Sequence, residues 1–311
     1  MKLDTDIVIV GSGAAGGVLA ATLAEKTDKK IILLEKGGYY EGSSIEQEEL
    51  KVRHLFAERG TRGTKDGSMP VRGGQCVGGG TTVNVALCFD PIESVWKKWK
   101  SEYGLDQYSF NSTANDYDIS GLNMPNALED IRKRINIHKP PDDMINDNNR
   151  LFSKGCKAEG VSFKKFELNI KDCLECGFCA MGCKYDRKMG TMITYIADAI
   201  KNGVQVIHNF DVQKIKFSGK NKNKKASYIQ GNIVKAHKHS LPNKYQDGPV
   251  TISAGLIIVA AGAVESPSLL VRSKHPDPND AIGRGLVIHP SLPIIGIQDK
   301  EIVNYRGITG S

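Results

Sequence analysis

The first patterned segment of the chain lies at its N-terminal end, where aliphatic residues concentrate over residues 5–10 and a glycine-rich turn follows at 11–17. Residues 18–26 have the composition of a helix, and residues 31–34 are four consecutive aliphatic residues. Strands of a parallel sheet are buried on both faces and therefore read as aliphatic runs. We predict the β-α-β opening of a doubly wound α/β sheet.

The remainder of the chain alternates loops, helices and strands. Residues 37–90 are rich in loop-forming residues, and Asp90-Pro91 predicts the start of a helix that runs through Trp96 and Trp99. Further helices are predicted at 127–138, 148–159 and 192–201. Strands are predicted at 204–207, 212–217, 228–236 and 250–253, and a buried strand at 256–260. The strands from residue 212 onward predict a three-stranded β-meander that leads directly into the buried strand.

Composition limits the class of protein. The 311 residues are 40% hydrophobic and 25% charged, as in ordinary globular proteins, and the net charge of +7 is spread along the chain. We therefore expect no nucleic-acid partner. The sequence has no run of 18 apolar residues and no charged-then-apolar leader, so neither a transmembrane segment nor a signal peptide is expected. These features predict a cytoplasmic protein that is at most peripheral to a membrane.

A dinucleotide-binding motif occupies the turn after the first strand. Gly11-Ser12-Gly13-Ala14-Ala15-Gly16 has the spacing G-x-G-x-x-G, and Glu35 ends the next strand 19 positions after Gly16. The glycines let a diphosphate approach the backbone and the helix start, while the acidic residue accepts hydrogen bonds from the ribose. NADP is disfavoured because its 2′-phosphate would meet the charge of Glu35. The motif alone does not separate FAD from NAD, and a plain βαβ turn is the alternative.

Three further stretches carry a family resemblance, at residues 74–84, 262–273 and 283–290. Together with the first turn and the meander, they resemble the N-terminal FAD-binding portion of the glucose-methanol-choline (GMC) oxidoreductases. Within that family the chain is similar to alcohol and sugar dehydrogenases that carry a cysteine cluster. The resemblance implies a Rossmann-like FAD-binding fold of the glutathione-reductase type, with a three-stranded meander and an inserted cysteine-rich segment.

By the same resemblance, residues 1–300 form the FAD-binding domain, with a core at 1–104 and 185–300 and a helical, cysteine-rich insertion at 105–184. Residues 301–311 would begin a substrate domain that is largely missing from this sequence. The implied FAD-contacting residues are Gly11, Ser12, Gly13, Ala14, Gly16, Glu35, Gly78, Gly79, Thr81, Asn84, Val212 and Gly262. No histidine occurs within 74–84, so we expect noncovalent FAD.

The activity that the resemblance implies is oxidation of an alcohol CH–OH group by hydride transfer to flavin N5. In this family the catalytic histidine lies near the C-terminus of a longer chain, so we expect it in a missing C-terminal half or on a second subunit. Within this sequence, His289 is the candidate for the catalytic base, because its motif should place it nearest the flavin. The alternative is an FAD and iron–sulfur electron-transfer subunit whose substrate chemistry lies on a partner chain.

Four of the seven cysteines lie close together in the sequence, as Cys173-x-x-Cys176-x-x-Cys179-x-x-x-Cys183. This spacing is typical of bacterial ferredoxins, although Lys184 stands where those proteins have proline. It predicts an iron–sulfur cluster that takes electrons from the flavin and passes them to an acceptor protein or a quinone. Zinc and structural thiols without a metal are the alternatives.

Overall fold

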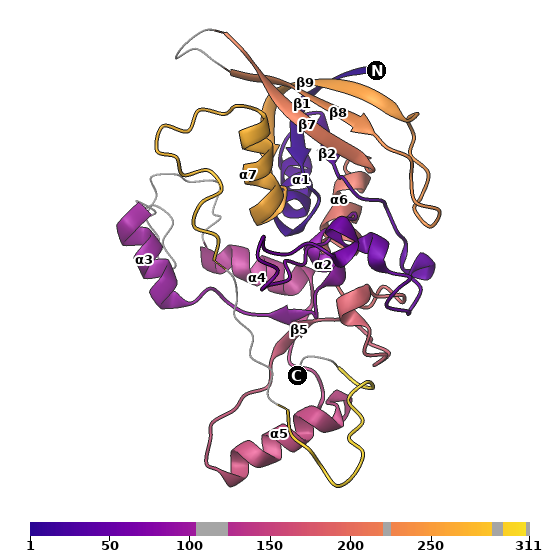
Figure 1. The fold of residues 1–311 in the computed structure, drawn as a ribbon, viewed down its shortest axis with the longest axis vertical. Coiled ribbons are helices and arrows are strands. Elements are labelled where there is room, and N and C mark those ends of the chain that lie inside the picture. The colour runs from indigo at the N-terminus through magenta and orange to yellow at the C-terminus, as the bar shows by residue number, and fades with distance from the viewer. Residues whose placement is uncertain (104–123, 220–224, 288–294, 309–311) are drawn as a thin grey trace. The chain divides into compact units, whose positions relative to one another are not determined.

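The computed structural model describes residues 1–103, 124–219, 225–287 and 295–308. The chain divides into two compact units, each built from several stretches of sequence (Figure 1). Unit 1 consists of residues 1–84, 178–186 and 190–301, and unit 2 of residues 85–177, 187–189 and 302–311.

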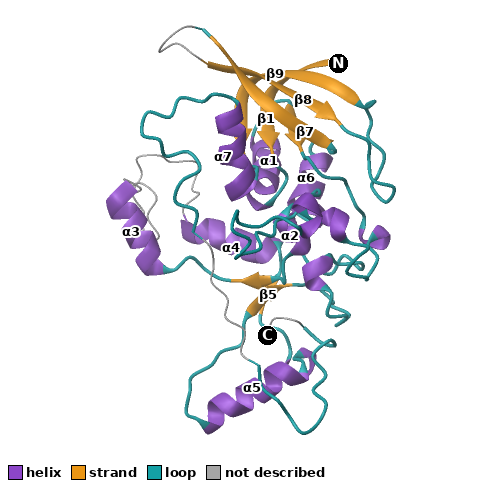
Figure 2. Cartoon of the chain, viewed as in Figure 1, coloured by secondary structure: helices purple, strands orange, loops and turns teal. Residues whose placement is uncertain are grey.

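Unit 1 is built on a six-stranded sheet with the strand order β6-β2-β1-β9-β8-β7. The strands are β1 (Lys2–Val10), β2 (Ile31–Leu34), β6 (Gln205–Ile207), β7 (Phe210–Ser218), β8 (Lys225–Ile233) and β9 (Gly248–Val259). β1 pairs in parallel with β2 and β9, and β2 pairs in parallel with β6. β8 pairs antiparallel with β7 and β9. The α-helices of this unit are α1 (Ala14–Lys26), α2 (Gly80–Val83), α6 (Tyr195–Lys201) and α7 (Gly262–Arg272). Figure 2 labels β1, β7, β8 and β9 of this sheet and the helices α1, α2, α6 and α7.

The alternation of side chains along β1 explains how this sheet is covered. Ile7 and Ile9 pack in a core with residues of α1 and α6, whereas Val8 and Val10 pack in a second core with β7, β8 and Leu269 of α7. Successive side chains of a strand point to opposite faces, so a strand between two cores must be apolar at every position. The predicted β-α-β opening of a mixed α/β fold is confirmed.

The last part of the meander differs from the prediction. The strands expected at 250–253 and 256–260 form one continuous strand, β9, which spans Gly248–Val259. Its first half pairs with β8, and β1 runs beside it from Thr251 to Val259. Because β1 and β8 lie on its two edges, β9 joins the antiparallel meander to the parallel strands within one sheet. Leu256, predicted to be buried, is 51% exposed.

Unit 2 contains a three-stranded antiparallel sheet with the order β3-β5-β4. Its elements are β3 (Leu87–Cys88), α3 (Glu93–Tyr103), α4 (Met124–Arg134), β4 (Ile137–His138), α5 (Asp147–Ala158) and β5 (Glu167–Asn169). The predicted helix at 127–138 was too long, because its last two residues belong to β4. Asn136 has a left-handed backbone with φ of 53°, which ends a helix, and its side-chain Nδ2 donates to the carbonyl of Ile170 at 2.6 Å.

None of the helices within the described ranges is both long enough and apolar enough to cross a membrane. α1, with 13 residues, is shorter than the about 20 residues that span a bilayer.

Candidate functional site

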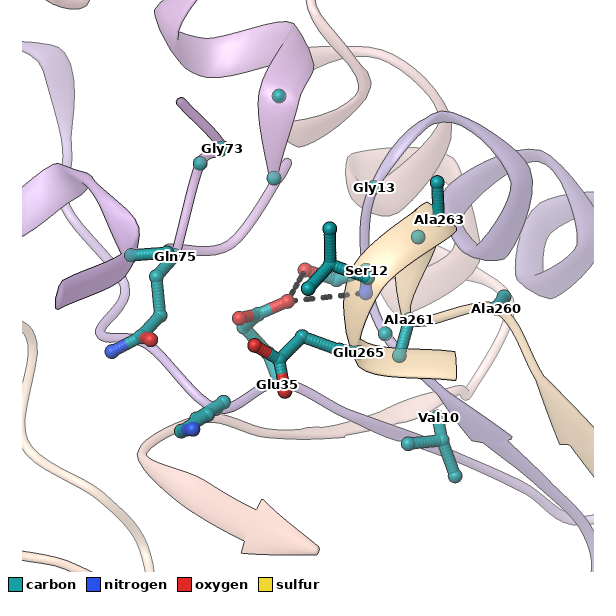
Figure 3. Close-up of a pocket in the computed structure, with 18 of the residues that line it drawn as sticks. Val10, Ser12, Gly13, Glu35, Gly73, Gln75, Ala260, Ala261, Ala263 and Glu265 are labelled. Carbon is teal, nitrogen blue, oxygen red and sulfur yellow. Dashed lines mark hydrogen bonds between the residues drawn. The ribbon is translucent and has the colours of Figure 1, made fainter. Parts of the chain in front are cut away.

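A cavity of about 790 Å³ opens in unit 1 at the carboxyl ends of the parallel strands. Its walls come from the glycine turn after β1, the end of β2, the start of β7 and the turn that joins β9 to α7 (Figure 3). The volume falls within the roughly 300–1,000 Å³ that is typical of ligand sites. In open α/β sheets, ligands bind outside the carboxyl ends of the strands, so the cavity has the expected position for a cofactor.

The glycine turn is held by backbone contacts that side chains would block. The Gly11 N–H donates to the carbonyl of Leu34 at 2.8 Å, and Gly11 has a left-handed φ of 102°. A Cβ at Gly16 would lie 1.8 Å from the carbonyl oxygen of Gly11. α1 then begins after Gly13, without a side-chain cap and without an acidic residue in its first turn. Its first N–H groups are therefore open to an anion in the cavity.

Glu35 stands at the end of β2 with its carboxylate buried beside this turn (Figure 3). One carboxylate oxygen accepts from the Ser12 N–H at 3.1 Å and from the Ser12 hydroxyl at 2.6 Å. The other accepts from the Gly37 N–H at 2.9 Å. Burial raises the pKa of Glu35 above its ordinary value, although the hydrogen bonds from Gly37 and Ser12 oppose this effect. The carboxylate is thus fixed in position at the cavity wall.

The second glycine cluster packs directly on the first. The Gly78 N–H donates to the Ser12 hydroxyl at 3.2 Å, and a Cβ at Gly79 would lie 2.9 Å from the Cα of Gly13. Thr81 donates from its hydroxyl to the carbonyl of Gly78 at 2.7 Å, which ties the start of α2 to this cluster. The two glycine-rich stretches, far apart in sequence, therefore form adjoining walls of one cavity.

A loop at residues 56–75, which we call the strap, forms another wall. Isolated β-bridges join Phe56 to Gly74 and Gly63 to Pro70, so that the strap folds back on itself. The Val71 N–H donates to the carbonyl of Arg62 at 2.9 Å. These bonds join the two limbs of the strap to each other, and its residues Ala57, Arg62 and 70–75 help to line the cavity.

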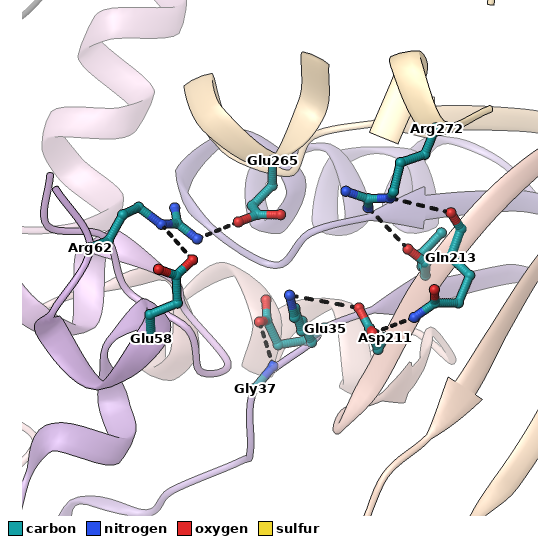
Figure 4. A network of polar contacts seen from close by, with 10 residues as sticks. Glu35, Gly37, Glu58, Arg62, Asp211, Gln213, Glu265 and Arg272 are labelled. Atoms are coloured by element: carbon teal, nitrogen blue, oxygen red, sulfur yellow. Dashed lines mark hydrogen bonds and ion pairs between the residues drawn. The ribbon is translucent and has the colours of Figure 1, made fainter. Parts of the chain in front are cut away.

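A polar network crosses the cavity walls (Figure 4). Arg62 of the strap pairs with Glu265 in the first turn of α7, and its Nε donates to Glu58 at 3.1 Å. Arg272, the last residue of α7, donates to the carbonyls of Val212 and Gln213, both at 3.4 Å. Sequence reasoning missed this network, because its partners are brought together only by the fold.

Most of the residues predicted to contact the cofactor gather at this cavity. Those that line it are Gly11, Ser12, Gly13, Ala14, Glu35, Gly79, Thr81, Asn84, Val212 and Gly262. Gly16 and Gly78 do not line it but pack behind its wall. The lining residues that the sequence analysis did not identify include Lys36, Arg62, Arg72, Asp211, Glu265 and Arg272.

The four clustered cysteines do not form a metal site in the described part of the chain. Cys173 and Cys176 belong to unit 2, and Cys179 and Cys183 belong to unit 1. Across the described ranges, no group of three or more His, Cys, Asp or Glu side chains is arranged to hold a metal ion. The structure therefore does not support the iron–sulfur cluster, or the zinc alternative, that the spacing predicted.

No histidine among the described residues lines the cavity. His289 lies outside the described residues. Three others gather elsewhere in unit 1, where the rings of His54 and His237 stack with their centroids 4.2 Å apart and the ring of His239 lies beside them. Burial, together with the nearby His237, lowers the pKa of His54 to about 4. These three histidines therefore do not line the candidate site.

Comparison with known proteins identifies the class to which this fold and cavity belong. The family model described as GMC oxidoreductase matches residues 6–291. The chain therefore belongs to the GMC oxidoreductase family, which confirms the resemblance drawn from its motifs. Family membership supports FAD as the cofactor.

The chain is similar to several curated relatives. It is 28% identical over 309 residues to the long-chain-alcohol oxidase FAO3 of Arabidopsis thaliana, covering 98% of this chain and 39% of that protein. It is 21% identical over 324 residues to an alcohol dehydrogenase (acceptor) of Pseudomonas putida, covering 98% of this chain and 54% of that protein. The chain thus spans about two fifths of the plant oxidase and about half of the bacterial dehydrogenase.

Solved structures of flavoenzymes share the fold. A formate oxidase matches with a TM-score of 0.56 at 17% identity, covering 88% of this chain and 48% of that one. A pyridoxine 4-oxidase from Mesorbium loti matches with a TM-score of 0.53 at 19% identity, covering 86% of this chain and 51% of that one. At these identities the likeness shows the fold alone.

Proposed function

We propose that the chain is the FAD-binding portion of an oxidoreductase that oxidises an alcohol CH–OH group. The observation that carries this proposal is the cavity itself, where the open N-terminus of α1 and the buried carboxylate of Glu35 meet the second glycine cluster. The names of the relatives, which include alcohol oxidases and an alcohol dehydrogenase, favour an alcohol as substrate.

The residues at the cavity fit the ADP half of FAD. The N–H groups at the start of α1 would hold the diphosphate, because the helix dipole favours negative charge there. Glu35 would accept from the ribose hydroxyls, since the ionised carboxylate keeps acceptor capacity beyond the three bonds it already takes. The backbone of Val212 would contact the adenine at the start of β7.

The second glycine cluster would bind the rest of the cofactor. Gly79, Thr81 and Asn84 line the cavity beside the glycine turn and would lie against the diphosphate and the isoalloxazine. When bound, FAD supplies a flavin ring that accepts a hydride from the alcohol carbon. Noncovalent binding is expected, because residues 74–84 contain no histidine. The base that takes the hydroxyl proton is proposed to lie on the remainder of the protein or on a partner chain.

The iron–sulfur part of the interpretation rests on cysteine spacing alone. An FAD and iron–sulfur subunit that delivers electrons to an acceptor protein or a quinone stays the alternative proposal. The described residues do not form a ligand set for such a cluster. We also propose a cytoplasmic location.

The test is to purify the chain, reconstitute it with FAD and precipitate it with acid. We expect flavin absorption in the folded protein and free FAD in the supernatant. Flavin that stays with the pellet would refute noncovalent binding, and a chain that takes up no FAD would refute the proposed function. A second measurement separates the two proposals: iron and acid-labile sulfide are assayed in anaerobic preparations of the wild type and of Cys176→Ser. Iron and sulfide that are present in the wild type and depleted in the variant would favour the electron-transfer subunit.

A further inference from the structure

All but one of the charged side chains that line the cavity have a hydrogen-bond or ion-pair partner among the described residues. Four basic side chains line it, Lys36, Arg62, Arg72 and Arg272, together with three acidic ones, Glu35, Asp211 and Glu265. Each acidic side chain has partners in the protein. Glu35 accepts from Ser12 and Gly37, Asp211 accepts from Gln213 and lies 3.7 Å from the Lys36 ammonium, and Glu265 pairs with Arg62.

Three of the four cations are likewise engaged. Lys36 is paired with Asp211, and Arg62 with both Glu58 and Glu265. Arg62 is the most enclosed of these, with 13% of its side chain exposed. Arg272 donates to two carbonyls at the start of β7 and stands at the C-terminus of α7, where the helix dipole favours a cation.

Arg72 differs from the other three. No hydrogen bond or ion pair joins its side chain to any other described residue, although it lines the same cavity. A cation that faces a ligand cavity without a protein partner retains its full capacity to bind an anion, because no carboxylate already neutralises it. In the same cavity, the open N-terminus of α1 also attracts negative charge.

The packing of the glycines brings the strap close to that helix N-terminus. A Cβ at Gly74 would lie 2.2 Å from the carbonyl oxygen of Gly79, and a Cβ at Gly79 would lie 2.9 Å from the Cα of Gly13. Arg72 stands two residues before Gly74 in the strap, and its exposed side chain lines the cavity. Figure 3 shows the neighbouring Gly73 and Gln75 on one side of the cavity and Ser12 and Gly13 on the other.

We propose that Arg72 binds the diphosphate of FAD from the strap side, opposite the N–H groups that begin α1. The inference rests on the FAD-binding function proposed above. The diphosphate carries two negative charges, and the helix N-terminus supplies only about half of one positive charge. Arg72 supplies a positive charge that no carboxylate opposes and donors that no other described residue occupies, and its planar guanidinium can donate two parallel hydrogen bonds to phosphate oxygens.

The test compares Arg72→Gln with Arg59→Gln in the full chain. Arg59 is an exposed arginine of the same strap that does not line the cavity, so its loss removes the same charge without touching the site. FAD affinity is measured by flavin fluorescence on the apo-protein at low and high salt, and ADP affinity by calorimetry. We expect Arg72→Gln to weaken both ligands about tenfold at low salt, and less at high salt because salt screens the contact.

The matched variants decide the outcome. Arg59→Gln should bind within about twofold of the wild type, and Arg72→Lys, which keeps the charge and loses the guanidinium fork, should fall between wild type and Arg72→Gln. Equal affinity of Arg72→Gln and Arg59→Gln for FAD would overturn the assignment while leaving the FAD function intact. A wild-type chain that binds neither FAD nor ADP would refute the proposed function, and this inference with it.

Discussion

Replacement of Glu35 by glutamine is the sharpest test of how the nucleotide end of the site is built. The carboxylate accepts from Ser12 on one oxygen and from the Gly37 N–H on the other. A glutamine amide has one oxygen, so it can accept either the hydrogen bonds from Ser12 or the one from Gly37. Its NH₂ group would then face a donor at the other position. An unsatisfied buried donor costs about 1–3 kcal/mol. The free energy of unfolding of the apo-protein should therefore fall by about that amount at neutral pH.

The same substitution should change the pH dependence of stability in a defined direction. Burial raises the pKa of Glu35 in the folded state above its ordinary value of 4.5. A raised pKa means that ionisation opposes folding, so the contribution of Glu35 is fully present below pH 4.5 and is lost as pH rises through the folded-state value. Glutamine does not titrate. The stability difference between wild type and Glu35→Gln should therefore be larger near pH 5 than near pH 8.

The assay is urea denaturation of the apo-protein at both pH values, followed by FAD titration. Glu25→Gln, at an exposed position near the end of α1, is the matched control and should leave stability and FAD affinity unchanged. FAD affinity of Glu35→Gln should fall about tenfold or more, because the ribose loses a charged acceptor. A stability difference that grows from pH 5 to pH 8 would show that the carboxylate is stabilised at this position, and our account of its burial would be wrong.

Three further substitutions test two separate parts of unit 1. Gly16→Ala should destabilise the apo-protein by about 1–3 kcal/mol, because its Cβ would meet the carbonyl oxygen of Gly11. Gly13→Ala, whose Cβ meets nothing within 4 Å, should keep the wild-type melting temperature and weaken FAD binding. Equal melting temperatures for the two variants would contradict the close packing of Gly16. His54→Phe should reduce the loss of stability on acidification from pH 7 to 5, since the lowered pKa of His54, about 4, makes the wild type less stable as pH falls below 6.5. Urea denaturation of both proteins at the two pH values measures this loss. Equal losses in wild type and variant would contradict the lowered pKa of His54.

Local pattern was sufficient for the opening of the fold and for the first half of the site. Residues 31–34 were predicted as a strand with the bounds of β2, because a run of four aliphatic residues is typical of a buried strand. The glycine turn and Glu35 were predicted for the same reason, since their chemistry depends on spacing within one βαβ unit. The sequence did not predict that residues 248–259 form the single strand β9, because Gly255 interrupts the aliphatic run. The strand is continuous because it pairs with β1 on one edge and with β8 on the other.

The sequence by itself therefore determined the family, the α/β class and the short-range spacing of the glycine turn and Glu35. The tertiary structure decided which charges remain available at the cavity, because ion pairing depends on distance in space. Arg62 and Glu265 are 203 positions apart, and nothing in either neighbourhood predicts that they meet. It also decided the conformation of the strap. The sequence of the strap has no periodic hydrophobic pattern, and isolated β-bridges and backbone hydrogen bonds hold its conformation. Hence Arg72 could be distinguished from its paired neighbours only after the chain had folded.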